Sequence, residues 1–162
     1  MTDNAPAHPV HLAHRPRVGG LVVPWITPQI NGQYLFGKLT DLSQRRCLLQ
    51  YRCQICGDRL PERAILFARS SDLDWMCTPE PATCPPCAWY SAMACPMLSG
   101  RMRQYRASQH PAALRLGAVA ESWYAVWVRW YDVVDHPAKP DTMAASWMRI
   151  PPLRIRPVPV RG

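Results

Sequence analysis

Two Cys-x-x-Cys pairs carry the clearest chemistry in this sequence. Cys53 and Cys56 form the first pair, Cys84 and Cys87 form the second, and 27 residues separate Cys56 from Cys84. With two residues between them, paired thiolates can reach one ion from a tight turn, and two such pairs complete a tetrahedral zinc site. The spacing therefore predicts one structural zinc ion per chain. Because cysteine would fill all four positions, no water would remain on the zinc to do catalysis.

Three further cysteines, Cys47, Cys77 and Cys95, have no paired neighbour. We expect them to be buried thiols, although Cys77 or Cys95 could replace one of the assigned ligands. The Cys84-Pro-Pro-Cys87 motif could also be a redox dithiol. Zinc is the better interpretation, because no βαβ pattern surrounds this motif and a second Cys-x-x-Cys pair accompanies it.

A strand pair is expected between the two cysteine pairs. Residues 63–69 (RAILFAR) predict a strand, residues 73–77 predict its partner, and residues 70–72 predict the turn between them. Gly57 directly follows the first pair, where the backbone must fold its amides toward the sulfur atoms. The lobe should therefore begin with a metal-binding turn and continue into a hairpin.

The second cysteine pair is expected at the start of a helix. Pro85 and Pro86 fit a first helical turn, where no amide donor is needed. The helix should continue over residues 88–95, with Trp89 and Met93 on its inner face. The following proline then ends it.

This order of knuckle, hairpin and helix resembles the treble-clef zinc fingers. The motif CQICG, followed by CPPCA and ACPML, also resembles a group of small uncharacterised proteins from actinobacteria and their phages. The resemblance is clearest in the central third of the chain. It implies the zinc lobe and its four cysteine ligands, and it implies no activity.

Two local signals precede the lobe. Asn31-Gly32 is a strong turn dipeptide between two short apolar runs, because both residues tolerate positive φ. Thr40 or Asp41 can cap a helix over residues 42–50.

Two segments after the lobe carry further signals of secondary structure. Residues 112–134 fit either two strands or one face of a helix, and their β-branched and aromatic residues favour the two strands, with a turn near residues 121–122. Asp141 should cap a short amphipathic helix that runs through Arg149.

The chain is expected to divide into an arm, a domain and a tail. Residues 1–17 predict a disordered arm. Residues 18–150 predict a single α+β domain with the zinc lobe over residues 53–98, and residues 151–162 predict an extended Pro/Arg tail. The fold class is thus a small, irregular, β-rich α+β domain built around a treble-clef-like four-cysteine zinc lobe. Three histidines of the arm recur every three residues and could bind a metal adventitiously: His8, His11 and His14.

The sequence contains no residue set that supports an enzyme. Treble-clef nucleases need a histidine base and further metal ligands, but no histidine lies between residues 15 and 109. Phosphate-binding glycine loops and the G-x-S-x-G and H-E-x-x-H motifs are also absent from the sequence. Asp132, Asp135 and His136 could form an acid–base cluster, but a turn with capping carboxylates is the simpler interpretation. We therefore expect a non-catalytic protein.

Charge is concentrated on both sides of the lobe. The chain has 162 residues and a net charge of +8. Residues 1–56 carry six basic and two acidic groups, and residues 99–162 carry ten basic and four acidic groups. Residues 57–98 are acidic, with three basic and five acidic groups. An anionic partner should therefore meet the flanking segments and not the lobe itself.

The favoured function is a zinc-finger protein that binds DNA or RNA through basic segments flanking the lobe. The residues expected to contact phosphates are Arg45, Arg46, Arg101, Arg103 and Arg106. Arg59, Arg63 and Arg69 should matter less, because acidic residues surround them. The alternative is a protein-interaction adaptor, such as a phage or accessory protein that binds a host or bacterial protein. Its extended tail would then add to a sheet edge of the partner.

The sequence lacks two features that would indicate a membrane span or secretion. It contains no run of about 18 apolar residues, so we expect no membrane span. The N-terminal residues lack the apolar segment of a signal peptide, which favours a cytoplasmic location. Thiols stay reduced there, and reduced thiols can bind a metal.

Overall fold

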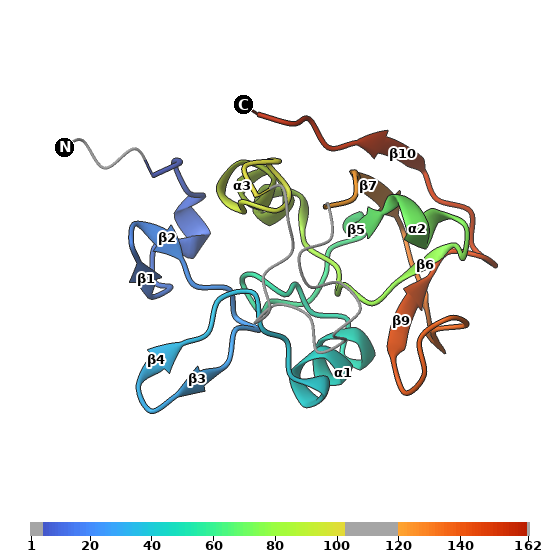
Figure 1. Ribbon diagram of the computed structural model, residues 1–162, viewed down its shortest axis with the longest axis horizontal. Helices are drawn as coiled ribbons and strands as arrows, with labels where there is room; N and C mark the ends of the chain where they lie inside the picture. The colour runs from blue at the N-terminus through green and yellow to red at the C-terminus, as the bar shows by residue number, and fades with distance from the viewer. Residues whose placement is uncertain (1–4, 103–119, 162) are drawn as a thin grey trace.

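Short helices and small antiparallel sheets make up the fold in the computed structural model, which describes residues 5–102 and 120–161 (Figure 1). This content confirms the expected α+β class. Within the described ranges, no helix is long and apolar enough to cross a bilayer. The helical elements are η1 (Val10–Leu12, a 3₁₀ turn), α1 (Asp41–Leu49), α2 (Ser70–Leu73) and α3 (Pro85–Ala94). The strands are β1 (Arg17–Val18), β2 (Leu21–Val22), β3 (Gln29–Ile30), β4 (Gln33–Tyr34), β5 (Ala64–Arg69), β6 (Cys77–Thr78), β7 (Trp123–Val128), β8 (Asp132–Asp135), β9 (Met143–Ser146) and β10 (Arg154–Pro157).

The turn and the helix cap that were predicted before the cysteine lobe are both present in the structure. Asn31 and Gly32 have φ values of 50° and 78° in the turn of the β3–β4 hairpin. Thr40 caps α1, because its hydroxyl oxygen accepts the backbone N–H of Ser43 at 3.2 Å. Both predictions depend on contacts within a few residues, so the surrounding fold does not alter them.

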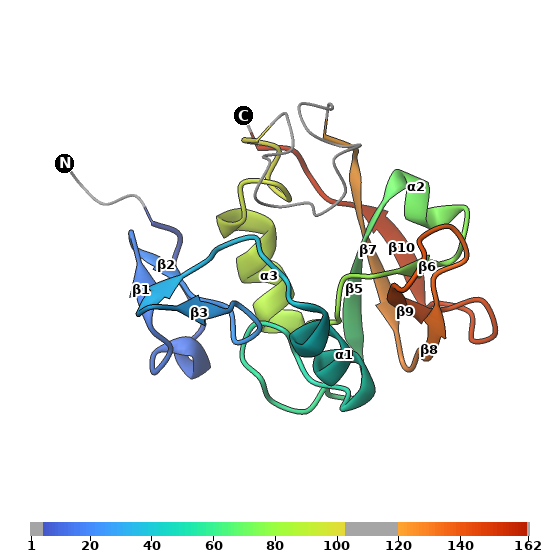
Figure 2. The ribbon, with the colours of Figure 1, turned by 60° about the horizontal axis from the view of Figure 1, so that its bottom comes forward.

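The N-terminal segment packs on the cysteine lobe where it is described, although residues 1–17 were expected to form a disordered arm. Leu12, in η1, is fully buried among residues of the lobe. The backbone N–H groups of Trp25 and Ile26 donate to carbonyl oxygens in the metal-binding turn, at 2.9 and 3.0 Å. In both views the N-terminal hairpins lie on one side of α3 and the sheet of β5, β7 and β10 lies on the other (Figures 1 and 2).

The larger apolar core lies on the sheet formed by β5, β7 and β10. β7 is the middle strand and pairs antiparallel with both neighbours. Leu66, Val126 and Val128 are at most 1% exposed and pack with Tyr131 and Trp147. The C-terminal segment, which was expected to be an extended tail, contributes β10 as the third strand of this sheet.

A second sheet has the order β6-β9-β8. The helix predicted from Asp141 is wrong, because residues 143–146 form the middle strand β9. Asp141 has a left-handed backbone (φ 54°), and strand pairing on both sides outweighs a weak helical preference. Of the two strands expected over residues 112–134, the second forms as β7, directly after residues 121–122 where the turn was expected, and β8 follows it in the other sheet. Residues 112–119 lie outside the described ranges.

The strand pair expected between the cysteine pairs does not form as predicted. Residues 70–73 form α2 because the Asp72 carboxylate accepts the backbone N–H of Arg69 at 2.9 Å and caps this turn. β6 pairs with β9, and the long partner of β5 is β7. β5 still bridges to the lobe, since Ile65 pairs with Thr83 just before α3.

Asp72 is the centre of a buried ionic network. Its side chain is 1% exposed, and its Oδ2 atom lies 3.7 Å from a guanidinium nitrogen of Arg69. Its Oδ1 atom lies 3.9 Å from Nε2 of His136 and 3.7 Å from Nζ of Lys139. Arg69 also pairs with Glu80 at 3.1 Å. The network therefore ties β5 and α2 to the loop between β8 and β9.

Replacing Asp72 by alanine should lower the free energy of unfolding by about 3–5 kcal/mol, because removing one partner of a buried ion pair leaves its partners desolvated. Urea denaturation followed by circular dichroism measures this loss. Asp132→Ala is the control, since its partner Arg149 has a side chain that is 82% exposed. An exposed pair of that kind contributes less than about 1 kcal/mol. Equal losses of unfolding free energy in the two variants would show that the buried network stabilises the fold no more than an exposed ion pair does.

Candidate metal centre

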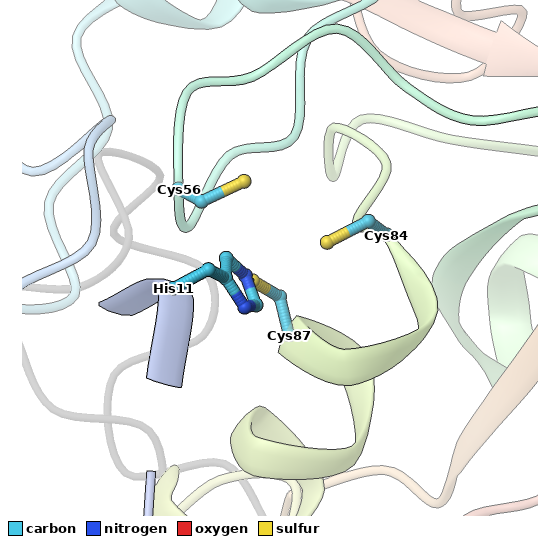
Figure 3. A group of neighbouring side chains, drawn as sticks. All are labelled: His11, Cys56, Cys84 and Cys87. Atoms are coloured by element: carbon cyan, nitrogen blue, oxygen red, sulfur yellow. The ribbon is translucent and has the colours of Figure 1, made fainter. Parts of the chain in front are cut away.

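Three segments bring potential metal ligands to one place. They are the turn after α1, the start of α3, and η1. The sulfur atoms of Cys56, Cys84 and Cys87 and one ring nitrogen of His11 all lie within 4.8 Å of one another. Figure 3 shows these four side chains pointing toward one another from the three segments. A cluster of thiols and an imidazole at this separation can hold a metal ion.

Cys53 adjoins the same cluster. It is fully buried, and hydrogen bonding with the thiols of Cys56, Cys84 and Cys87 holds the pKa of Cys53 well below its usual range. Cys53 packs in one apolar cluster with Cys56, Cys84 and Cys87, whereas His11 takes the fourth place among the ligand atoms that lie within 4.8 Å of one another.

Protons are shared unevenly among these thiols. Hydrogen bonding to Cys53 raises the pKa of both Cys84 and Cys87 well above the usual range, and burial acts in the same direction. The physical cause is that one thiolate accepts hydrogen bonds from its neighbours, and its charge opposes a second ionisation nearby. A divalent cation removes this conflict, because it stabilises several thiolates at once.

Cys87 decides which face of α3 is buried. Cys87, Tyr90, Ser91 and Ala94 follow one another at helical spacing, and all four are buried. Trp89, which the sequence analysis placed on the inner face, is 55% exposed. That prediction is wrong. Apolar residues occur on all sides of this short helix, so their periodicity alone does not determine which face turns toward the core. The position of Cys87, whose thiol must reach the cluster, determines the buried face of α3.

Gly57 closes the metal-binding turn against Trp25. Its φ is +81°, and a Cβ atom at this position would lie 2.7 Å from ring carbons of Trp25. Its N–H donates to the carbonyl of Cys53 at 2.8 Å. Arg46 lies over the same indole, with its guanidinium carbon 5.3 Å from the ring centroid. The glycine therefore serves both the turn and the contact with the N-terminal segment.

One side of the cluster is apolar and the other borders a cavity. Leu12, Val22 and Ile55 pack around the buried side. The hydroxyl oxygen of Tyr90 accepts the N–H of Val22 at 2.9 Å, which fastens β2 to α3. On the open side, a cavity of about 680 Å³ is lined by His11 with Cys56, Cys84 and charged residues of the loop after Gly57.

His11 is a potential metal ligand that was not among the four assigned from the sequence. Its Nε2 atom lies 3.2 Å from the sulfur of Cys87, and its ring is partly exposed at the cavity. The only signal in the sequence was the recurrence of histidine in the arm. What placed His11 here is its neighbour Leu12, which is buried in the lobe.

The remaining cysteines lie elsewhere. Cys47 and Cys77 are 0% and 1% exposed, and the Cys47 thiol donates to the carbonyl of Arg52 at 3.1 Å. Cys95 ends α3 and packs beside the apolar cluster around Ile65. None of the three belongs to the group of mutually close ligand atoms.

The arginines expected to contact phosphates have different surroundings. Arg45 and Arg46 are exposed on α1. Arg101 donates to two carbonyl oxygens at the end of α3, at 3.1 and 2.9 Å, and thereby caps that helix. Arg103 and Arg106 lie outside the described residues.

No protein-family model, curated protein or solved structure matches this chain. The resemblance to treble-clef fingers and to actinobacterial and phage proteins therefore stays a prediction. The inferences about this site depend on its geometry and chemistry alone.

Replacing any one of Cys53, Cys56, Cys84 and Cys87 by serine should release the metal and unfold the lobe. A structural metal of this kind contributes on the order of 10–16 kcal/mol to folding. Elemental analysis of the purified protein should find one metal ion per chain in the wild type and in the control variants Cys47→Ser and Cys77→Ser.

His11→Ala separates the two possible ligand sets. Retention of one metal ion per chain in this variant, with loss in Cys53→Ser, would support the four-cysteine set. Loss in His11→Ala with retention in Cys53→Ser would contradict it and would make His11 the fourth ligand.

Cys47 and Cys77 should resist alkylation in the folded protein near neutral pH. Burial raises the pKa of Cys47 to about 12 and that of Cys77 to about 11, so few thiolates form. Because the folded pKa of Cys47 exceeds the unfolded value of 9.0, its contribution to stability is present below pH 9.0 and is lost as the pH rises toward about 12. Mass spectrometry after iodoacetamide treatment, with and without urea, measures the protection. Rapid labelling of Cys47 in the folded state would refute it.

Proposed function

We propose that a structural zinc ion is held by Cys53, Cys56, Cys84 and Cys87. Thiolate sulfur is a preferred donor for zinc, and four thiolates fit its tetrahedral geometry. The packing of Cys53, Cys56 and Cys87 in one buried cluster, with Cys84 against it, supports this set. Zinc bound in this way supplies folding free energy and has no position left for a reactive water. His11 then donates its N–H to the Cys87 thiolate from outside the ligand set.

A treble-clef arrangement is the second part of the proposal. The order of elements supports it, because the metal-binding turn precedes β5, Ile65 of β5 bridges to Thr83, and α3 then carries the second cysteine pair. The lobe departs from a simple finger in one respect. The long pairing of β5 is with β7, so the lobe shares its main strand with the rest of the protein.

The proposed role of this scaffold is nucleic-acid binding. The observation that carries it is a set of four arginines on α1 and the adjoining turn, of which three are exposed and Arg52 is partly buried: Arg45, Arg46, Arg52 and Arg59. Asp41, at the opposite end of α1, is the only acidic residue of that helix. The guanidiniums of Arg46 and Arg52 are held in place, one over an indole ring and one on a carbonyl oxygen at 2.9 Å. Guanidiniums fixed in this way lose little freedom when they meet a phosphate.

Titration of DNA and RNA at two salt concentrations tests this role. The wild type should bind, and its affinity should fall as salt rises, because phosphate contacts release counterions. The double variant Arg45→Gln/Arg46→Gln should reduce the slope of log affinity against log salt by about 0.7–0.9 per lost contact.

Arg149→Gln/Arg156→Gln is the matched control, since it removes the same charge from exposed positions outside α1. An equal effect of both double variants would mean that net charge alone matters, which contradicts an interface on α1. Absence of binding at low salt would reject the nucleic-acid role.

A protein-binding adaptor is the alternative, and the exposed apolar residues of α1 favour it. Leu42 is 79% exposed and Leu49 is 53% exposed. The form expected from the sequence, in which the tail adds to a partner's sheet, has less support because residues 154–157 already pair with β7. A pull-down from bacterial lysate distinguishes the roles. Stoichiometric recovery of a protein, without nucleic-acid binding, would favour the adaptor.

A further inference from the structure

A second cavity lies where the end of α1, the arms of the metal-binding turn and the residues after β7 meet. Its volume is about 560 Å³. No carboxylate is among the described residues that line it. Those residues combine aromatic rings, two guanidiniums and aliphatic side chains: Leu49, Gln50, Tyr51, Arg52, Arg59, Leu60 and Trp130.

Two stacked rings form one wall of this cavity. The ring centroids of Tyr51 and Trp130 are 4.0 Å apart, with an angle of 20° between the planes. Tyr131 lies 4.8 Å from Tyr51 and is buried beneath it in the core. Trp130 is nevertheless 49% exposed. The rings therefore form a rigid aromatic platform that keeps an indole accessible at the surface.

The backbone of Tyr51 is strained to hold its ring in this position. Its φ is +51°, a conformation that favours glycine. Tyr51 ends α1 as the left-handed residue of a Schellman motif, since its N–H donates to Leu48 at 3.3 Å and the N–H of Arg52 donates to Cys47 at 3.1 Å. A glycine would end the helix without strain, but the cavity would lose its aromatic wall.

Two arginines, Arg52 and Arg59, line the cavity. Arg52 and Arg59 are opposite partners in an antiparallel bridge on the two arms of the metal-binding turn. Like charges directly opposite each other destabilise such a pair, and an anion between them removes the repulsion. Arg52 is fixed by hydrogen bonds to Gln50 at 3.0 Å and to the Gly57 carbonyl at 2.9 Å.

The neighbouring acidic residues do not compensate these two charges within the cavity. Asp58 and Glu62 line the other cavity, beside the metal centre, and Glu62 pairs with Arg129. Acidic residues surround Arg59 in the sequence, which predicted a minor role for it. The fold instead lets Arg59 reach the aromatic cavity as well.

We propose that this cavity, here called the stacking site, binds one nucleotide unit of single-stranded nucleic acid. The base stacks on Trp130, and the phosphate lies between Arg52 and Arg59. A nucleotide matches both features, because it joins a flat base to a negatively charged phosphate. Base stacking on an aromatic side chain tolerates any sequence. Arg45 precedes Leu49 by one helical turn, so it lies on the face of α1 that leads to the stacking site. This inference rests on the proposed nucleic-acid role.

The test uses the full-length, metal-loaded protein with a labelled oligothymidylate, and fluorescence anisotropy measures the affinity. Trp130→Ala should weaken binding about 5- to 150-fold, the range for one stacked base. Trp89→Ala is the control, since it removes another exposed indole, on α3, and it should leave the affinity unchanged. Arg59→Gln should weaken binding more than Arg63→Gln, an equal loss of charge at an exposed neighbour outside the stacking site.

Trp130→Phe is a conservative variant that should stay folded. It keeps a ring for stacking, so it should bind nearly as well as the wild type, but the quenching of tryptophan fluorescence by the oligonucleotide should diminish. Unchanged quenching in this variant would overturn the assignment of Trp130. Duplex DNA of the same sequence should bind more weakly than the single strand, because its bases are already stacked.

Failure of the stacking site can be distinguished from failure of the nucleic-acid role. If the wild type binds and Arg45→Gln/Arg46→Gln weakens it, while Trp130→Ala and Arg59→Gln match their controls, only the stacking site is rejected. If the wild type binds neither single strands nor duplex, both proposals fail. Binding of free thymidine monophosphate as tightly as the oligonucleotide would overturn the assignment to a strand.

Discussion

The convergence of three thiols and one imidazole, from Cys56, Cys84, Cys87 and His11, is the constraint on which the rest of the lobe depends. It joins the turn after α1 to the first turn of α3, two segments that share little regular secondary structure. The rotation of α3 follows, because Cys87 must reach the cluster and the residues one and two turns later are then buried with it. The N-terminal segment depends on the same point, since Leu12 and Val22 pack around the cysteines.

The turn over residues 52–59 has two faces. Its cysteines point inward to the cluster, whereas Arg52 and Arg59 at its base line a surface cavity next to α1. Hydrogen bonds within the turn, such as Cys53 N–H to the Asp58 carbonyl at 2.8 Å, hold both sides in one shape. A bound metal would therefore also preorganise the basic surface, so that less conformational entropy is lost when an anion binds.

The sequence by itself determined the features that depend on near neighbours. The spacing within each Cys-x-x-Cys pair, the prolines at the start of α3, the Asn31-Gly32 turn and the Thr40 cap all act over a few residues. Each of these signals appears in the structure where it was expected, because its hydrogen bonds or steric limits close within one turn of chain. The α+β class followed from the same local patterns.

Only the tertiary structure decided the features that join distant segments. His11 reaches Cys87 across 76 positions, and Trp130 reaches Tyr51 across 79, so neither contact has a signature in local spacing. Residues 143–146 form a strand and not a helix because β6 and β8 supply hydrogen-bond partners on both sides. Residues 70–73 form a helix because Asp72 both caps it and meets cations from elsewhere in the chain. In each case the energy of a long-range contact exceeds a local preference of about 1 kcal/mol or less, and that energy cannot be read from neighbouring residues.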